Sequence, residues 1–94
     1  MERIVLACHG VPPAAGAEAA ADITAEFRDH RQWQKNVVCS WDGARLILQA
    51  DTECDPKGLA LTDEFSDCIC AYISGGFDGE ITVQSVTSLP DAAV

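Results

Sequence analysis

The chain has 94 residues and a mass of 10.0 kDa, a size that accommodates one folded domain. Hydrophobic residues make up 48% and charged residues 22% of the sequence, an ordinary globular composition that argues against disorder. The formal net charge is −9, from 15 acidic and 6 basic residues. This balance argues against a nucleic-acid binder and against docking on anionic membranes, because both require many lysines and arginines.

The cysteines and the apolar segments bear on the compartment. No apolar run approaches the roughly 20 residues of a membrane helix, and the stretch near the N-terminus is too short for a signal peptide. The number of cysteines is odd, which does not suit a closed set of disulfides. We therefore expect a cytoplasmic protein with reduced thiols. The cysteines are Cys8, Cys39, Cys54, Cys68 and Cys70.

Negative charge concentrates in the second half of the chain. Residues 51–94 hold nine acidic residues and one basic residue, whereas residues 1–50 hold six and five. Such an acidic segment usually keeps a small protein in solution, and a docking surface for a basic partner is the alternative interpretation. The predicted acidic surface comprises Asp51, Glu53, Asp55, Asp63, Glu64 and Asp67.

The first part of the chain predicts a strand followed by a helix. The continuous apolar run at 4–8 is typical of a buried strand. A loop rich in glycine and proline follows, and Pro13 can open a helix that we expect over 14–31. Its buried stripe is predicted from apolar residues that recur every four positions, namely Ala19, Ile23 and Phe27.

A β-hairpin is predicted next. The Asp-Gly dipeptide at 42–43 separates two β-rich segments, 36–41 and 44–51, and this is a strong hairpin signal. A two-residue turn there would pair Cys39 with Leu46, and cross-strand partners share a face. In that register one face of the hairpin carries Val38, Ser40, Arg45, Ile47 and Gln49.

The second part of the chain predicts another helix and another strand. An acidic loop over 51–58 precedes a helix over 61–74, with Thr62 as its expected N-cap and a glycine pair as its stop signal. A last strand is expected over 80–89, followed by a frayed tail at 91–94. The apolar face of the helix is predicted to comprise Leu61, Phe65, Cys68, Ile69, Tyr72 and Ile73.

The element order βαββαβ within a single domain, 1–90, predicts a ferredoxin-like two-layer α+β sandwich. In that fold a four-stranded antiparallel sheet carries two helices on one face. Another α+β roll is the alternative. The opposite face of the sheet is then open to solvent.

The open face of the sheet is the predicted interaction surface. Val5, Val38 and Ile47 would lie on neighbouring strands and form a short apolar band, and a contiguous band is a better sign of an interface than single exposed residues. Arg45 and Gln49 complete the candidate interface. This face has neither the aromatic residues nor the basic rim of an RNA-binding sheet.

Cys8 and His9, at the end of the first predicted strand, form a candidate thiol site. A position just before a helix N-terminus can lower the pKa of a thiol and attract an anion. Adjacent strand residues point to opposite faces, however, which directs Cys8 into the core and away from His9. A buried cysteine beside a loop histidine is the competing interpretation.

Two motifs fail as metal sites. Cys68 and Cys70 would lie about 200° apart around a helix, which prevents chelation of one ion. The acidic loop begins with alternating carboxylates like a calcium loop, but Pro56 and Thr62 replace the required glycine and glutamate. We therefore expect no metal and no cofactor.

The sequence thus predicts a small acidic, non-enzymatic interaction domain. It homodimerises or docks a protein partner through the open sheet face, and a variant of this hypothesis makes it an inhibitor or regulator of a basic partner. The alternative is a small-molecule-binding or thiol-dependent module that uses Cys8 and the first strand–helix loop. An enzyme ranks third, because no nucleophile, base and orienting residue converge.

Overall fold

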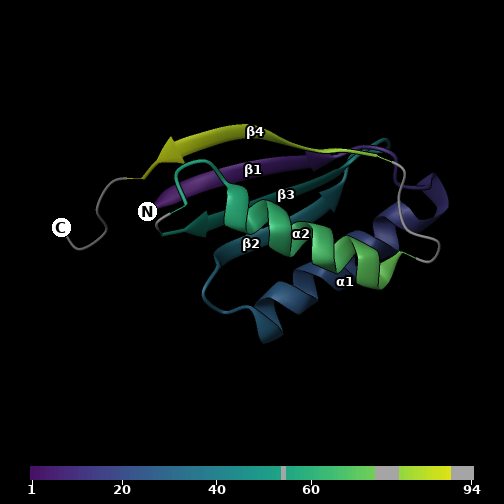
Figure 1. Cartoon of the computed structure of the whole chain (residues 1–94). Helices are drawn as coiled ribbons and strands as arrows, with labels where there is room; N and C mark the ends of the chain where they lie inside the picture. Colours follow the sequence, from purple (N-terminus) through teal and green to yellow (C-terminus); the bar gives the residue numbers. More distant parts are fainter. Residues whose placement is uncertain (54, 74–78, 90–94) are drawn as a thin grey trace.

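The fold consists of four strands and two helices in the predicted order βαββαβ (Figure 1). A computed structural model describes residues 1–53, 55–73 and 79–89. The predicted tail at 91–94 and the predicted Gly75-Gly76 stop signal lie outside these residues. The elements are β1 (Glu2–Cys8), α1 (Pro13–His30), β2 (Lys35–Trp41), β3 (Leu46–Thr52), α2 (Leu59–Tyr72) and β4 (Ile81–Ser88).

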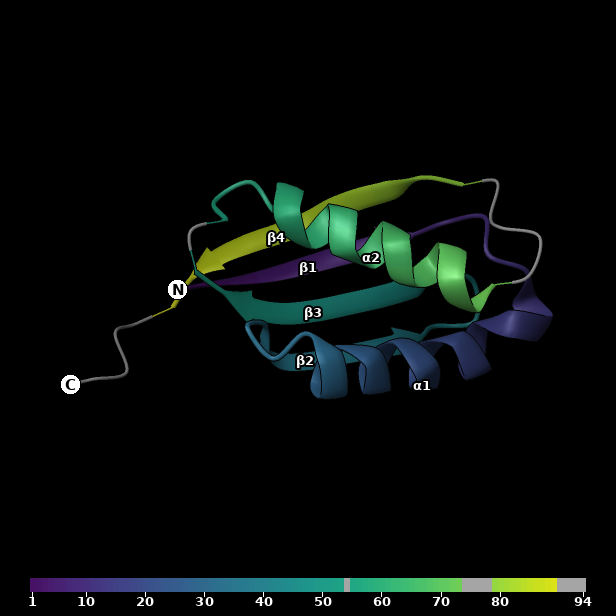
Figure 2. The ribbon, with the colours of Figure 1, turned by 60° about the horizontal axis from the view of Figure 1, so that its bottom comes forward.

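The four strands form one antiparallel sheet in the order β2-β3-β1-β4. Both helices lie against the same face of this sheet, as the two views of the ribbon show (Figures 1 and 2). Each half of the chain is a strand–helix–strand unit, and the two units interleave because β1 lies between β3 and β4. The ferredoxin-like two-layer arrangement is therefore confirmed.

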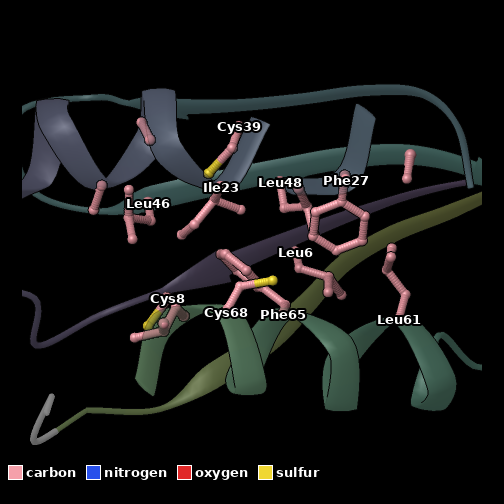
Figure 3. Packing of buried hydrophobic residues seen from close by; sticks show 14 of the residues in the cluster. Leu6, Cys8, Ile23, Phe27, Cys39, Leu46, Leu48, Leu61, Phe65 and Cys68 are labelled. Carbon is pink, nitrogen blue, oxygen red and sulfur yellow. The ribbon is translucent and has the colours of Figure 1, made fainter. Parts of the chain in front are cut away.

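The hydrophobic core fills the space between the helices and the sheet (Figure 3). Phe27 of α1 and Phe65 of α2 are its largest side chains and have no exposed surface. Alternate residues of the two central strands, β1 and β3, pack against these rings, because successive side chains of a strand point to opposite faces of the sheet. These strand residues are Ile4, Leu6, Cys8, Leu46, Leu48 and Ala50.

Helix α1 begins at Pro13, in agreement with the prediction that this proline opens the helix. The predicted stripe of Ala19, Ile23 and Phe27 is buried. Gly16 extends it at the N-terminal end, where the helix passes directly over the Trp41 ring of β2. A β-carbon at this glycine would overlap that ring, so the close approach of α1 and β2 requires the absence of a side chain.

We expect Gly16→Ala to lower the free energy of unfolding by about 1–3 kcal/mol, because the added methyl group overpacks the contact with Trp41. In a Trp41→Leu background the same substitution should be neutral or stabilising by up to about 1 kcal/mol, since alanine favours helix over glycine. Urea unfolding of the four proteins measures both effects. An equal loss in the two backgrounds would show that steric contact with the ring is not the cause.

The hairpin forms as predicted, but its turn is longer than the two residues expected. Trp41 pairs with Leu46 and Cys39 with Leu48, so the register differs by two positions from the predicted one. Asp42 closes the turn, because its Oδ1 accepts hydrogen bonds from the backbone N–H groups of Ala44 and Arg45 at 2.9 and 2.6 Å. A shift of two positions preserves the face of every side chain, and the predicted faces of the strands therefore hold.

Helix α2 begins two residues earlier than predicted and is not capped by Thr62. Asp55 lies before the helix, and its carboxylate accepts hydrogen bonds from the backbone N–H groups of Ala60 and Leu61 at 3.2 and 3.0 Å. The hydroxyl of Thr62 instead donates to the carbonyl of Gly58 at 2.7 Å. The cap comes from a residue distant in the loop because the turn at 55–58 folds it back over the first helical turn.

Strand β4 contains a bulge at its centre. Val5 of β1 pairs with Ser85 and Leu6 pairs with Val83, which leaves Gln84 without a partner on β1. Val83 and Val86, on either side of the bulge, share the helix side of the sheet, since their partners Leu6 and Ile4 are core residues. Both valines nevertheless remain 43% and 38% exposed.

Candidate functional site

The face of the sheet opposite the helices is organised as cross-strand rows. One row contains Val38, Gln49, Val5 and Ser85, and the next contains Ser40, Ile47, Ala7 and Thr82. The third row contains Lys35, Asp51, Arg3 and Thr87. Neighbours in a row lie close enough for their side chains to touch. We call these twelve residues the open face.

The apolar residues of the open face lie together, as the sequence predicted. Val5 and Ile47 are half-buried, and Ala7 between them is fully buried by its neighbours. Val38 on the edge strand β2 is 53% exposed. The predicted interface residue Gln49 lies between Val38 and Val5. Val38 is therefore only a diagonal neighbour of Ile47, and the role of the band as an interface stays a prediction.

Arg45 does not lie in this band, and its predicted placement on the strand is wrong. The longer turn places Arg45 before β3 begins. There its Nε donates to Asp42 Oδ2 at 3.0 Å. Asp42 thus holds both the backbone and the side chain of Arg45 within the turn.

The third row of the open face is built around a buried carboxylate. Asp51 is 2% exposed. Its two oxygens accept hydrogen bonds from Nε and Nη2 of Arg3 at 2.8 and 3.0 Å, and its Oδ2 also accepts one from Asn36 Nδ2 at 2.8 Å. The guanidinium of Arg3 and the carboxylate of Asp51 thus form a bidentate ion pair, which is a strong geometry for such a contact. The hydrogen bond from Arg3, with that from Asn36, keeps the pKa of Asp51 below its usual value.

Asn36 reaches Asp51 through a local distortion of β2. Its φ is 52°, which is the left-handed region that asparagine tolerates better than most residues. The pairing of β2 with β3 is irregular between Lys35 and Val38. The distortion lets the amide of Asn36 reach the open face and complete the shell of donors around Asp51.

We expect Asp51→Asn to lower the free energy of unfolding by about 1–3 kcal/mol at neutral pH, because Arg3 loses its ionised partner. The native pKa of Asp51 lies below its unfolded value of about 3.9. Its contribution is therefore present above that pH and disappears as the pH falls through the native pKa. Denaturant unfolding of wild type and variant at about pH 7 and in acid should show the gap closing in acid.

The matched control for this prediction is Asp67→Asn, which removes an equal charge from an exposed position of α2. Its effect should stay within about 0.5 kcal/mol, as for most surface substitutions. If Asp51→Asn and Asp67→Asn are indistinguishable at neutral pH, the network on the open face does not stabilise the fold.

The predicted acidic surface is correct only in part. Asp51 and Asp55 are 2% and 7% exposed, because one is enclosed by Arg3 and Asn36 and the other caps α2. Glu64 is half-buried, and its carboxylate accepts hydrogen bonds from side chains of the segment that follows α1. Glu53, Asp63 and Asp67 are exposed as predicted.

The open face carries a net charge of +1, unlike the strongly acidic whole chain. Among its twelve residues the only carboxylate is that of Asp51, which Arg3 neutralises, and Lys35 is the remaining charged residue. Glu53 and Glu80 lie beyond the ends of β3 and β4. The net charge of −9 therefore resides elsewhere than on these strand residues.

The candidate thiol site is not activated. Cys8 is fully buried, its thiol donates to the backbone carbonyl of His9 at 3.6 Å, and burial raises the pKa of Cys8 to about 11. His9 is exposed, so its ring lies on the solvent side of the strand end. Burial likewise raises the pKa of Cys39 to about 12. These thiols carry no thiolate at neutral pH and resemble core hydrophobic residues.

The hollow beside the first loop does not involve the candidate thiol site. Its volume is about 380 Å³, and it is lined by the loop, by α1 and by the end of α2 rather than by Cys8 or His9. Within residues 1–53, 55–73 and 79–89, no group of three His, Cys, Asp or Glu side chains is placed to hold a metal ion.

In the native reduced protein we expect Cys70, which is exposed, to react quickly with iodoacetamide, and Cys8 to react only after denaturation. Peptide mapping by mass spectrometry distinguishes the cysteines one by one. Cys68, which lies two positions from Cys70 on the buried side of α2, serves as the internal control. Native labelling of Cys8 at the rate of Cys70 would contradict this assignment and revive the thiol hypothesis.

Comparison with protein-family models, with curated proteins and with solved structures finds no match for this chain. Neither described helix is long and apolar enough to cross a membrane. Functional inference therefore depends on the geometry of the open face.

The signals for this site were partly readable in the sequence. Strand alternation and the hairpin predicted which apolar side chains share the open face. The Arg3–Asp51–Asn36 network was missed, because its residues are up to 48 positions apart and only the pairing of β3 with β1 and with β2 brings them together. Two hints were available in the sequence. Arg3 comes directly before the buried apolar run at 4–8, and Asp51 ends the other apolar strand segment.

Proposed function

We propose that this chain is a small non-enzymatic interaction module that associates with a second copy of itself through the open face. The observation that carries the proposal is an apolar band, Val5, Ala7, Ile47 and Val38, on a surface whose twelve residues carry a net charge of only +1. In a protein of net charge −9, such a surface is where two copies can approach with the least repulsion.

Charge favours a second copy over a basic partner as the occupant. A basic partner would be attracted to exposed carboxylates such as Glu53, Asp63 and Asp67. Those residues lie on loops and on α2, away from the apolar band. Because a two-fold symmetric contact brings identical patches together, any excess charge on the open face would be opposed by its own copy. Because Arg3 neutralises Asp51, that excess is limited to one charge per copy, Lys35 on the edge strand β2.

The open face is also a rigid platform. The bidentate contact between Arg3 and Asp51 joins β1 to β3, and Asn36 joins β2 to the same carboxylate. A surface whose side chains are already ordered loses less conformational entropy on association. Arg3 is 42% exposed in its side chain, and arginine is among the residues enriched at the centre of interfaces.

The enzymatic and thiol-dependent hypotheses receive no comparable support. The buried thiol of Cys8 has a pKa of about 11, and its hydrogen bond goes to a backbone carbonyl rather than to a base. A nucleophilic cysteine needs a lowered pKa or an adjacent base.

Val38→Lys combined with Ile47→Lys should abolish the contact through the open face, because it places four lysines in a symmetric interface. Light scattering behind a sizing column should then report about half the mass of the wild-type assembly. Ala17→Lys combined with Ala21→Lys adds the same charge at exposed positions of α1 and should leave the mass unchanged. An unchanged mass for the Val38 and Ile47 variant would refute the proposal.

The salt dependence of the association distinguishes a second copy from a basic partner as the occupant of the open face. Raising the ionic strength screens the repulsion between two chains of net charge −9 and should strengthen self-association, since the Debye length falls from about 10 Å at 0.1 M salt to about 3 Å at 1 M. Docking of a basic partner would weaken under the same change. Self-association that weakens with salt would contradict the charge argument.

A further inference from the structure

Strand β4 is an edge strand with few features that would prevent another strand from pairing with it. Within residues 1–53, 55–73 and 79–89 it hydrogen-bonds to β1 on one side only, and six of its eight residues are exposed. Its sequence, ITVQSVTS, contains no charged residue and no proline. Natural proteins usually blunt such an edge with a charge, a proline or a bulge, because its free N–H and C=O groups offer a template for another strand. Of these three devices β4 has only the bulge at Gln84.

The other edge of the sheet differs in this respect. Strand β2 carries a charged residue, Lys35, and its pairing is broken where Asn36 adopts a left-handed conformation. A second strand could not pair along its full length without meeting that distortion. Strand β4 is also irregular, at the Gln84 bulge, so the two edges differ in charge: β2 carries Lys35, whereas β4 carries no charged residue.

Two valines of β4 are incompletely covered although they face the helix side. Val83 and Val86 pair with the core residues Leu6 and Ile4 but remain 43% and 38% exposed. Leu59 at the start of α2 is 65% exposed. A strand added beside β4 would continue the sheet and shelter both valines on its helix side.

The bulge makes β4 self-complementary. Because Gln84 is the extra residue, the helix side of the strand changes from odd to even positions at the centre. An antiparallel pairing of two β4 strands about the point between Gln84 and Ser85 then places Val83 opposite Val86 of the other copy, both on the helix side. It also places Thr82 opposite Thr87 on the open-face side. At the centre of this pairing Val83 meets Val86 and Thr82 meets Thr87, whereas at the two ends Ile81 meets Ser88; no position carries a charge.

From these observations we infer that β4 pairs edge to edge with β4 of a second copy, about a two-fold axis perpendicular to the sheet. The contact doubles the four-stranded sheet and keeps the helices of both copies on one side. Val83–Val86 pairs form twice, as a two-fold contact requires. The inference does not depend on the proposed role of the open face, because the apolar band of that face lies on β1, β2 and β3, and none of its residues belongs to β4.

The test exploits the predicted pairing of Val83 with Val86. Val83→Lys combined with Val86→Lys opposes two like charges at each of the two equivalent sites and should separate the copies. Val83→Lys combined with Val86→Glu opposes unlike charges at the same sites and should retain the pair. Light scattering should report about half the wild-type mass for the first variant and the wild-type mass for the second, with circular dichroism to verify folding.

Each outcome decides between the alternatives. An unchanged mass for the double-lysine variant, or the same loss in both variants, overturns the β4 register. Loss of mass only in the Val38 and Ile47 variant supports the open face and overturns the edge contact, whereas loss only in the double-lysine variant does the reverse. A monomeric wild type at all concentrations overturns both.

Hydrogen exchange of the wild-type protein gives a second measurement that needs no substitution. Edge pairing should slow exchange of β4 backbone amides at high protein concentration, and dilution should abolish this protection. Amides of β3, which is paired on both sides within one chain, serve as the internal control. Exchange of β4 that does not depend on concentration overturns the edge contact even if the lysine variants fail to fold.

Discussion

Two helices can cover only one face of a four-stranded sheet, and most features of this protein follow from that constraint. The chain buries Phe27 and Phe65 against alternate residues of β1 and β3. Every second residue of those central strands must then point to the other side, where no element of the described chain covers it. A small protein has few residues with which to manage this second face, and the solution found here combines a narrow apolar band with a buried ionic row.

The ionic row shows how a polar group can be buried on a face without a second layer. Asp51 lies at an inner position of the sheet and is enclosed by Arg3 and by Asn36 rather than by a hydrophobic layer. Three donors to one carboxylate offset the cost of removing it from water. The left-handed conformation of Asn36 is the local strain that this arrangement requires, and strain of this kind tends to be retained where the surrounding structure uses it.

The distribution of charge links the fold to the proposed function. The chain concentrates carboxylates on loops and helices, while the strand residues of the open face carry a net charge of +1 and β4 carries no charge. In a protein of net charge −9, these are the surfaces on which identical chains can meet. Both proposals, the contact through the open face and the contact through the β4 edge, depend on this same separation of acidic and uncharged surfaces.

The sequence by itself determined the element order and the fold class, because each signal was local. Strand alternation, the stripe of Ala19, Ile23 and Phe27, and the Asp-Gly turn are properties of neighbouring residues. The same local rules assigned Val5, Val38, Ile47 and Gln49 to one face. That assignment survived an incorrect turn length only because the register changed by two positions rather than one.

Tertiary structure decided what distant residues do to one another. Asp51 and Asp55 belong to an acidic segment in the sequence, yet pairing of β1 with β3 buries the first beside Arg3, and the fold of a loop makes the second a helix cap. The pattern of charges cannot distinguish a solvated carboxylate from a buried one, because the difference lies in partners many positions away. The bulge in β4, which sets the faces of Val83 and Val86, likewise exists only in the pairing of two strands.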